Sequence, residues 1–201
     1  MTTKTAQEIV NTVIASGVVM AQVPEEIISY VEWLLQRGGA SRILEIGSAA
    51  GATTEIWCEI ADTQMISVDL PSGIHGGVGP EACAARNDRL GSKYPAFTGI
   101  LGNSRSLSTV SLVERVLTGP LDMIFIDGDH TYDGVHSDYT LYRKFVRPGG
   151  IIMFHDIEDT PYHRNYPGSP VEVYRLWAEL TGEKYEFTVH AGWCGIGALI
   201  V

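Results

Sequence analysis

Short apolar runs alternate along the chain with longer segments whose apolar residues recur at helical spacing. The apolar runs predict strands at 42–46, 65–69, 97–101, 121–127 and 151–154. The segments between and after them predict helices at 52–61, 81–91, 106–117, 131–146 and 171–181. Strands that alternate with helices indicate a parallel sheet covered by helices on both faces.

The two ends of the chain depart from this alternation. Residues 5–20 and a segment from Pro24 to Gly38-Gly39 predict two N-terminal helices. Residues 185–190 and 196–201 predict two strands joined by a short turn, which should form an antiparallel hairpin at one edge of the sheet. We therefore expect an α/β fold with a doubly wound, seven-stranded sheet that is mostly parallel.

The length of 201 residues suits a single domain. Within it we expect residues 1–39 to form helices that either cover the site or make a homodimer interface, and residues 40–201 to form the core. The formal net charge of -10 argues against a nucleic-acid partner and favours a small ligand.

Three widely spaced cysteines, Cys58, Cys83 and Cys194, argue against a disulfide framework and favour buried thiols in a reducing compartment. The N-terminus shows no signal-peptide pattern, and no apolar run approaches the length of a membrane span. We expect a cytoplasmic protein without a membrane partner.

The first strand leads into a small-residue loop, from Glu45 to Gly51, at the start of a helix. Glycine permits a sharp turn and a close approach of ligand, and the helix N-terminus is electropositive. This pattern predicts a nucleotide-binding loop. The Gly47-x-x-x-Gly51 spacing is not the dinucleotide fingerprint, which argues against a dehydrogenase. The candidate binding residues in this stretch are Glu45, Gly47, Ser48, Gly51 and Thr53.

Polar residues follow the ends of further strands, where open parallel sheets bind their ligands. Asp69 ends the second strand and could accept hydrogen bonds from a ribose, while Asn103 and Ser104, after the third, could frame a base. Each residue taken alone could instead cap a turn or a helix.

Asp127 and Asp156 end neighbouring predicted strands, so their carboxylates should converge. Oxygen ligands suit a hard divalent ion such as Mg²⁺, Mn²⁺ or Ca²⁺. His155 is either a third ligand or a residue that points back into the core.

These motifs together resemble those of class I S-adenosylmethionine-dependent methyltransferases, over nearly the whole chain from about residue 24. The resemblance implies a Rossmann-like fold with S-adenosylmethionine held by the 44–51 loop, Asp69, Asn103, Ser104 and Asp127. The more specific segments are similar to a family of small-molecule O-methyltransferases that includes cephalosporin hydroxylase-like and macrolide-sugar enzymes, and more distantly to catechol and caffeoyl-CoA O-methyltransferases. These segments are 125–132, 148–150 and 154–156.

The resemblance also implies roles for single residues. Asp127, His155 and Asp156 fall at metal-ligand positions of the catechol type, although a histidine stands where that type usually has aspartate. His130 falls where the catechol type has a catalytic lysine, and a histidine with a neutral form near pH 7 could take the proton of an acceptor hydroxyl. The expected reaction is in-line methyl transfer to that hydroxyl.

The acceptor is expected to be a small molecule such as a sugar, a phenol or a natural product. Loops 70–80 and 157–170 should flank the pocket mouth, where Arg164 could hold a carboxylate or phosphate, or the loops are simply solvated. Trp193 is expected to pack rather than stack on a ligand. A metal-independent methyltransferase and a non-catalytic nucleotide-binding module remain the alternative interpretations.

Overall fold

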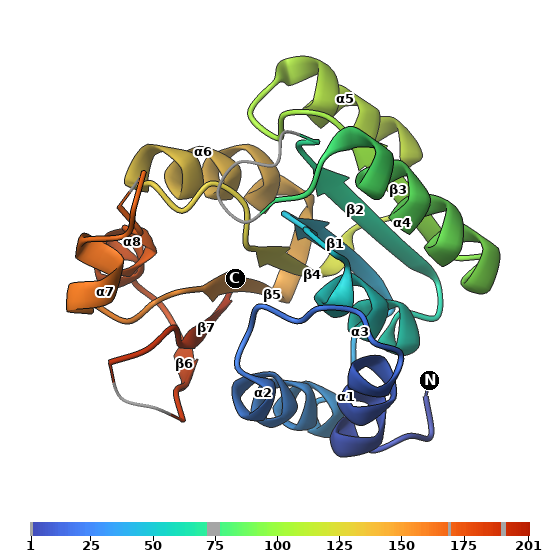
Figure 1. The fold of residues 1–201 in the computed structure, drawn as a ribbon, viewed down its shortest axis with the longest axis horizontal. Coiled ribbons are helices and arrows are strands. Elements are labelled where there is room, and N and C mark those ends of the chain that lie inside the picture. The colour runs from blue at the N-terminus through green and yellow to red at the C-terminus, as the bar shows by residue number, and fades with distance from the viewer. Residues whose placement is uncertain (1, 72–76, 169, 190–191) are drawn as a thin grey trace.

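The computed structural model describes residues 2–71, 77–168, 170–189 and 192–201. Its centre is a seven-stranded sheet with the order β3-β2-β1-β4-β5-β7-β6 (Figure 1). The strands are β1 (Arg42–Ile46), β2 (Gln64–Asp69), β3 (Phe97–Leu101), β4 (Leu121–Ile126), β5 (Val146–His155), β6 (Lys184–Phe187) and β7 (Ile196–Ile200).

The described helices pack around this sheet. They are α1 (Ala6–Ala15), α2 (Pro24–Gln36), α3 (Ala52–Ile60), α4 (Pro80–Lys93), α5 (Leu107–Val116), α6 (Tyr132–Tyr142), α7 (Pro161–Arg164) and α8 (Val173–Glu179), with a 3₁₀ turn η1 (Arg143–Phe145) after α6. None of the described helices is long and apolar enough to cross a bilayer.

Strands β1 to β5 pair in parallel, and β7 runs antiparallel to both β5 and β6. The predicted mostly parallel sheet with an antiparallel C-terminal hairpin is confirmed. The chain builds outward from β1 through β2 to β3 and then returns to place β4 on the other side of β1. Such a reversal opens a crevice at the carboxyl ends of β1 and β4, where doubly wound folds bind ligands.

Alternate residues of the buried strands pack into two separate hydrophobic cores, one on each face of the sheet. Ile43 and Met123 face α1, α2 and α3, whereas Leu44 and Ile124 face α5, α6 and α8. Figure 1 shows α1, α2 and α3 on one side of the sheet and α5 and α6 on the other. This double burial explains why the strands read as continuous apolar runs in the sequence.

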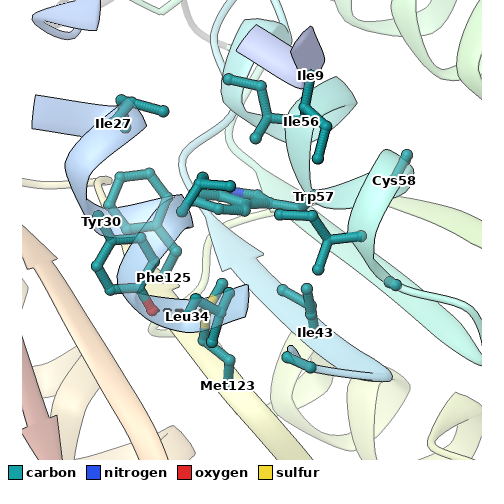
Figure 2. Packing of buried hydrophobic residues seen from close by; sticks show 14 of the residues in the cluster. Ile9, Ile27, Tyr30, Leu34, Ile43, Ile56, Trp57, Cys58, Met123 and Phe125 are labelled. Atoms are coloured by element: carbon teal, nitrogen blue, oxygen red, sulfur yellow. Dashed lines mark hydrogen bonds between the residues drawn. The ribbon is translucent and has the colours of Figure 1, made fainter. Parts of the chain in front are cut away.

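Aromatic side chains fill the first core. The ring of Tyr30 on α2 meets Trp57 of α3 edge to face at 6.0 Å, and Trp57 meets Phe125 of β4 at 5.5 Å. Figure 2 shows these side chains between the helices and the strands, with Tyr30 directed toward Met123. The hydroxyl of Tyr30 donates to Sδ of Met123 at 2.9 Å. The N-terminal helices are thereby packed on the strands that carry the site.

Three predicted boundaries were wrong by four residues or more, and the first is the end of the N-terminal helix, which was predicted to reach residue 20 and ends at Ala15. The helix predicted to run to residue 146 ends at Tyr142, and the strand predicted to begin at residue 151 begins at Val146. The Pro148-Gly149-Gly150 segment is therefore part of β5 and does not precede it. It pairs beside a register shift between Leu121 and Met123 of β4, and a Cβ on Gly150 would lie 3.0 Å from the carbonyl oxygen of Asp122.

The segment predicted as a loop at 157–170 also contains a helical turn, α7. The hydroxyl of Thr160 accepts a hydrogen bond from the His163 amide at 3.0 Å and caps this turn, and Pro161 occupies its first position. The turn places His163 beside the end of β5.

Candidate active site

The loop after β1 is shaped by two left-handed glycines. Gly47 has φ +85°, and a Cβ there would lie 2.0 Å from the carbonyl oxygen of Asp127. Gly51 has φ +92° and is the N-cap of α3, and a Cβ there would lie 2.7 Å from Cδ of Arg86. Gly47 thus lets the β1 and β4 loops touch, and Gly51 lets an arginine lie across the start of α3.

Glu45 organises this loop from beneath. Its buried carboxylate accepts hydrogen bonds from Ser48 Oγ at 2.9 Å, from Trp57 Nε1 at 3.0 Å and from Thr54 Oγ1. Burial raises the pKa of Glu45 to about 7, against hydrogen bonds from Thr54, Thr53 and Ser48. The structure gives Glu45, Ser48 and Thr53 a role in holding the loop, whereas their contact with a cofactor stays a prediction.

Asp69, at the end of β2, is paired with an arginine that the sequence did not single out. Nη1 of Arg86, on α4, donates to Oδ2 of Asp69 at 2.6 Å and to the carbonyl oxygen of Ala49 at 2.6 Å. The thiol of Cys83 also contacts Oδ2, at 3.5 Å. The contacts that Arg86 and Cys83 make with Asp69 both use Oδ2, and neither involves the other carboxylate oxygen, Oδ1.

The residues predicted to frame a base follow β3. Asn103 is exposed, and its Oδ1 accepts a hydrogen bond from the Arg105 amide at 2.9 Å, while the carbonyl of Ser104 accepts one from Tyr142 at 2.8 Å. Below them lies Asp138 of α6, fully buried, with neither oxygen in a well-aligned hydrogen bond among the described residues. Burial raises the pKa of Asp138 to about 7, opposed by the nearby Ser104 side chain.

Asp127, His130, His155 and Asp156 come together at the carboxyl ends of β4 and β5. The ring of His130 lies between the two carboxylates, with Nδ1 2.7 Å from Oδ2 of Asp156 and Nε2 3.2 Å from Oδ1 of Asp127. Nδ1 of His155 lies 3.3 Å from Oδ1 of Asp127 and 3.3 Å from Oδ1 of Asp156. The side chain of His155 is turned toward these acids.

The charges in this cluster shift one another's protonation. Burial by itself would lower the pKa of His130, but hydrogen bonds to Asp127 and Asp156 outweigh it and raise the pKa to about 10. Burial would raise the pKa of Asp156, but the charge of His155 holds it well below its usual range. The two flanking carboxylates thus favour the protonated form of His130, and its role as a proton acceptor stays a prediction.

Other side chains reach the same cluster from distant elements. Gln22, just before α2, donates a short hydrogen bond to Oδ2 of Asp127. His163 of α7 places Nε2 3.4 Å from Oδ1 of Asp156 while Nδ1 meets the carbonyl oxygen of Glu158 at 2.7 Å. Cys194, in the turn before β7, is buried, and its sulfur lies within 4.8 Å of ligand atoms of His155 and Asp156.

Glu26 on α2 ties the N-terminal helices to that turn. Its buried carboxylate accepts hydrogen bonds from the amides of Val189 at 3.3 Å and Gly195 at 3.2 Å. Burial raises the pKa of Glu26, against these two bonds.

An exposed aromatic group lies beside the cluster. The ring centroids of Tyr162 and Trp193 are 4.6 Å apart, and both side chains are about half exposed. Arg164, for which the sequence offered either anion binding or a place in a solvated loop, donates two hydrogen bonds to Asp159, at 2.7 and 2.6 Å, and its binding of a ligand anion stays a prediction. His75, in the loop 70–80 that is also predicted to flank the pocket mouth, lies outside the described residues.

The residues that sequence reasoning missed contact partners in other elements. Arg86 of α4 is 17 positions from Asp69 at the end of β2, and Gln22 is 105 positions from Asp127. Cys194 was interpreted as an idle thiol. Its position in a Gly-Trp-Cys-Gly turn between two strands at the same sheet edge as His155 was the signal available in the sequence.

Comparisons with known proteins agree with this architecture. A family model described as a methyltransferase domain matches residues 44–157, which include the glycine loop, Asp69 and all four residues of the acid-histidine cluster. An uncharacterized protein of Acanthamoeba polyphaga mimivirus is 30% identical over 115 residues, which are 54% of this chain and 51% of that protein. The chain thus spans about half the length of this curated relative.

Solved structures share the fold across nearly the whole chain. An O-methyltransferase from Bacillus cereus in complex with SAH superposes with a TM-score of 0.67 at 18% identity, covering 98% of this chain and 90% of that one. The MycE methyltransferase of the mycinamycin pathway, in complex with Mg, SAH and mycinamycin VI, gives a TM-score of 0.60 at 15% identity, covering 98% of this chain and 54% of that one.

The sheet order, the glycine loop and these superpositions define a Rossmann-like protein with the methyltransferase fold. Since the family model covers more than half of the chain, the protein belongs to the methyltransferase domain family. The resemblance seen in the sequence is confirmed at the level of family and fold.

Proposed function

We propose that this protein transfers a methyl group from S-adenosylmethionine to a hydroxyl group of a small molecule. The observation that carries the proposal is the buried cluster of Asp127, His130, His155 and Asp156, one strand away from the glycine loop. Family membership and the shared fold with O-methyltransferases support it.

The residues at the β1–β2 side of the crevice fit the cofactor. The loop from Gly47 to Gly51 leads into the start of α3, and the electropositive N-terminus of that helix suits a polar cofactor. Asp69 keeps Oδ1 outside its contacts with Arg86 and Cys83, so this oxygen is the proposed acceptor for ribose hydroxyls. Asn103 and Ser104 are the proposed neighbours of the adenine.

Asp127, His155 and Asp156 are the proposed holders of a divalent metal ion. Their oxygen and nitrogen atoms converge in a buried site, and among the described residues His155 has no well-aligned hydrogen-bond partner that would occupy its ring. When bound, such an ion lowers the pKa of an acceptor hydroxyl. MycE, which shares the fold, was solved with Mg.

His130 is the proposed proton acceptor, and its protonation depends on its two carboxylate neighbours. In this structure Asp127 and Asp156 hold the ring as an imidazolium. With Asp127 and Asp156 engaged as metal ligands, their hold on the His130 proton would weaken, and a ring nitrogen of His130 would be free to take a proton near neutral pH. His130 would thus take up the hydroxyl proton, and the loops would align the acceptor with the methyl group.

We propose that Tyr162 and Trp193 form the acceptor side of the site, which gives Trp193 a ligand contact in place of the packing role expected from the sequence. Exposed aromatic rings beside polar groups suit a sugar or a phenol, which present both an apolar face and hydroxyl groups. We further propose a cytoplasmic enzyme without a nucleic-acid or membrane partner, in line with the net charge of -10.

Substitutions at Asp156 and at Asp69 test the metal side and the cofactor side of the site separately. Asp156→Ala should abolish transfer of labelled methyl groups to a panel of sugars and phenols, while its affinity for S-adenosylmethionine in calorimetry stays within a few-fold of wild type. Asp69→Ala should instead weaken cofactor binding first. Loss of cofactor binding in Asp156→Ala would contradict the assignment. Cofactor binding and transfer that do not respond to added metal would favour a metal-independent methyltransferase.

A further inference from the structure

The acid-histidine cluster contains a sulfur ligand that oxygen-based metal chemistry does not require. One ligand atom each from His155, Asp156 and Cys194 lies within 4.8 Å of the others, and all three residues are buried. Two of the three donors are therefore nitrogen and sulfur. Such donors favour borderline transition metals, whereas Mg²⁺ and Ca²⁺ prefer oxygen.

His155 provides independent evidence that a ligand belongs here. Its side chain is only 5% exposed, and neither ring nitrogen has a hydrogen-bond partner of good geometry among the described residues. The two carboxylate oxygens 3.3 Å from Nδ1 are charge contacts and not aligned hydrogen bonds. A buried ring without a hydrogen-bond partner is costly, and coordination to a cation removes that cost.

The backbone holds two of these donors in uncommon conformations. Asp156 has φ +62° and Cys194 has φ +38°, both in the left-handed region that non-glycine residues seldom adopt. Strained positions of this kind persist where the surroundings fix them, and they gather at functional sites.

Three hydrogen bonds fix the turn that carries Cys194. The amide of Glu158 donates to the carbonyl oxygen of Cys194 at 3.0 Å, and the amide of Ile157 donates to that of Gly195 at 3.3 Å. The amide of Gly195 donates to Glu26 at 3.2 Å. The bonds from Glu158 and Ile157 join the turn to the segment that follows Asp156, so the Cys194 thiol and the Asp156 carboxylate are held on the same side of the site.

We propose that Cys194 joins the proposed metal ligands Asp127, His155 and Asp156, so that the centre binds a borderline transition-metal ion such as Zn²⁺ in preference to Mg²⁺. The inference rests on the proposed metal-assisted function and names the class of ion that the site takes. His163 orients the centre: its Nε2 lies 3.4 Å from Asp156, and its Nδ1 is held by the Glu158 carbonyl.

Cobalt(II) is the probe for this proposal, because a cysteine thiolate bound to Co²⁺ gives a charge-transfer band in the near ultraviolet. The full chain, freed of metal with a chelator, should show this band on titration with Co²⁺. The band should disappear on addition of equimolar Zn²⁺ and persist in a tenfold excess of Mg²⁺. The matched variants are Cys194→Ala, which should lose the band, and Cys58→Ala, a buried thiol of α3, which should keep it.

The outcomes separate this inference from the proposed function. Absence of the band at saturating Co²⁺, its persistence in Cys194→Ala, or its loss to Mg²⁺ at equal concentration would overturn the transition-metal site. Should Cys194→Ala fail to fold by circular dichroism, His155→Ala takes its place and should weaken Co²⁺ binding at least tenfold, with unchanged affinity overturning the inference. S-adenosylmethionine binding, measured separately by calorimetry, tests the methyltransferase proposal whichever metal binds.

Discussion

Asp69, the predicted ribose acceptor, also forms a buried ion pair with Arg86. It was chosen as a ribose acceptor because it ends a parallel strand, yet Arg86 holds one of its oxygens in a buried ion pair with an N–O distance of 2.6 Å. The side chains are 3% and 7% exposed, so neither charge is well solvated. The arginine therefore fixes the carboxylate in place and compensates its charge.

Arg86→Met should lower the free energy of unfolding by roughly 3 to 5 kcal/mol, because it leaves Asp69 as an uncompensated buried charge. Adding Asp69→Asn to that variant should recover a substantial part of the loss. Urea unfolding of the two single variants and the double variant measures this coupling. Strict additivity of the two effects would show that the pair does not act as a unit.

The raised pKa of the buried Asp138 carboxyl should make the stability of the fold depend on pH. Its pKa is raised by burial from 3.8 to about 7, so the folded state holds the proton more tightly than the unfolded state. Its contribution to the free energy of unfolding is then fully present below about pH 4, falls as pH rises to about 7 and levels off above that value. The full change corresponds to roughly 4 kcal/mol at 1.4 kcal/mol per pKa unit.

Asp138→Asn should remove that part of the slope and be more stable than wild type at about pH 8, by up to roughly 4 kcal/mol. Near pH 4 the two proteins should differ little, because the wild-type carboxyl is then neutral as well. Urea unfolding of both proteins at the two pH values makes the comparison. Equal slopes for wild type and variant would show that Asp138 ionises normally in the folded protein.

At the scale of elements, the loop between β1 and α3 depends on two glycines in different ways. A side chain at Gly47 would strike the backbone carbonyl of Asp127, which cannot move without shifting β4. A Cβ at Gly51 would lie 2.7 Å from Cδ of the Arg86 side chain, which is a smaller overlap than the 2.0 Å at Gly47 and does not involve backbone atoms. Both positions have positive φ, so any other residue is strained there as well.

Gly47→Ala should therefore destabilise the fold by more than Gly51→Ala, for which backbone strain of about 1 to 2 kcal/mol is expected. Thermal unfolding of the two variants, followed by circular dichroism, measures the difference. A larger loss for Gly51→Ala would mean that the contact between the β1 and β4 loops is not the tighter of the two.

The elements that could be predicted are those determined by local pattern. β3 spans the predicted residues, 97–101, because an apolar run between turns defines it, and Gly38-Gly39 ends α2 within two residues of its predicted stop. The early start of β5 could not be predicted, because it depends on a register shift in β4. Likewise, the sequence placed Asp127, His155 and Asp156 at one sheet edge. Glu26 joins through contacts with residues more than 160 positions away, and Arg86 joins because α4 packs beside the end of β2, which the local pattern does not encode.

At the scale of the whole molecule, the N-terminal helices are tied directly to the proposed catalytic edge. Gln22 bonds to Asp127, and Glu26 bonds to the turn that carries Cys194. Two predicted roles for this segment, covering the site or forming a homodimer contact, were left open by the sequence. The contacts of Gln22 and Glu26 show that these helices reach the site within one chain.

We propose that the crevice between β1 and β4 binds S-adenosylmethionine as a methyl donor. Calorimetric titration of the full chain with S-adenosylmethionine measures this binding directly. We expect S-adenosylmethionine to bind the wild-type protein saturably and one to one. Asp69→Ala should weaken this binding by tenfold or more, since the variant loses the proposed ribose acceptor. A titration of folded wild-type protein that shows no saturable binding would contradict the claim.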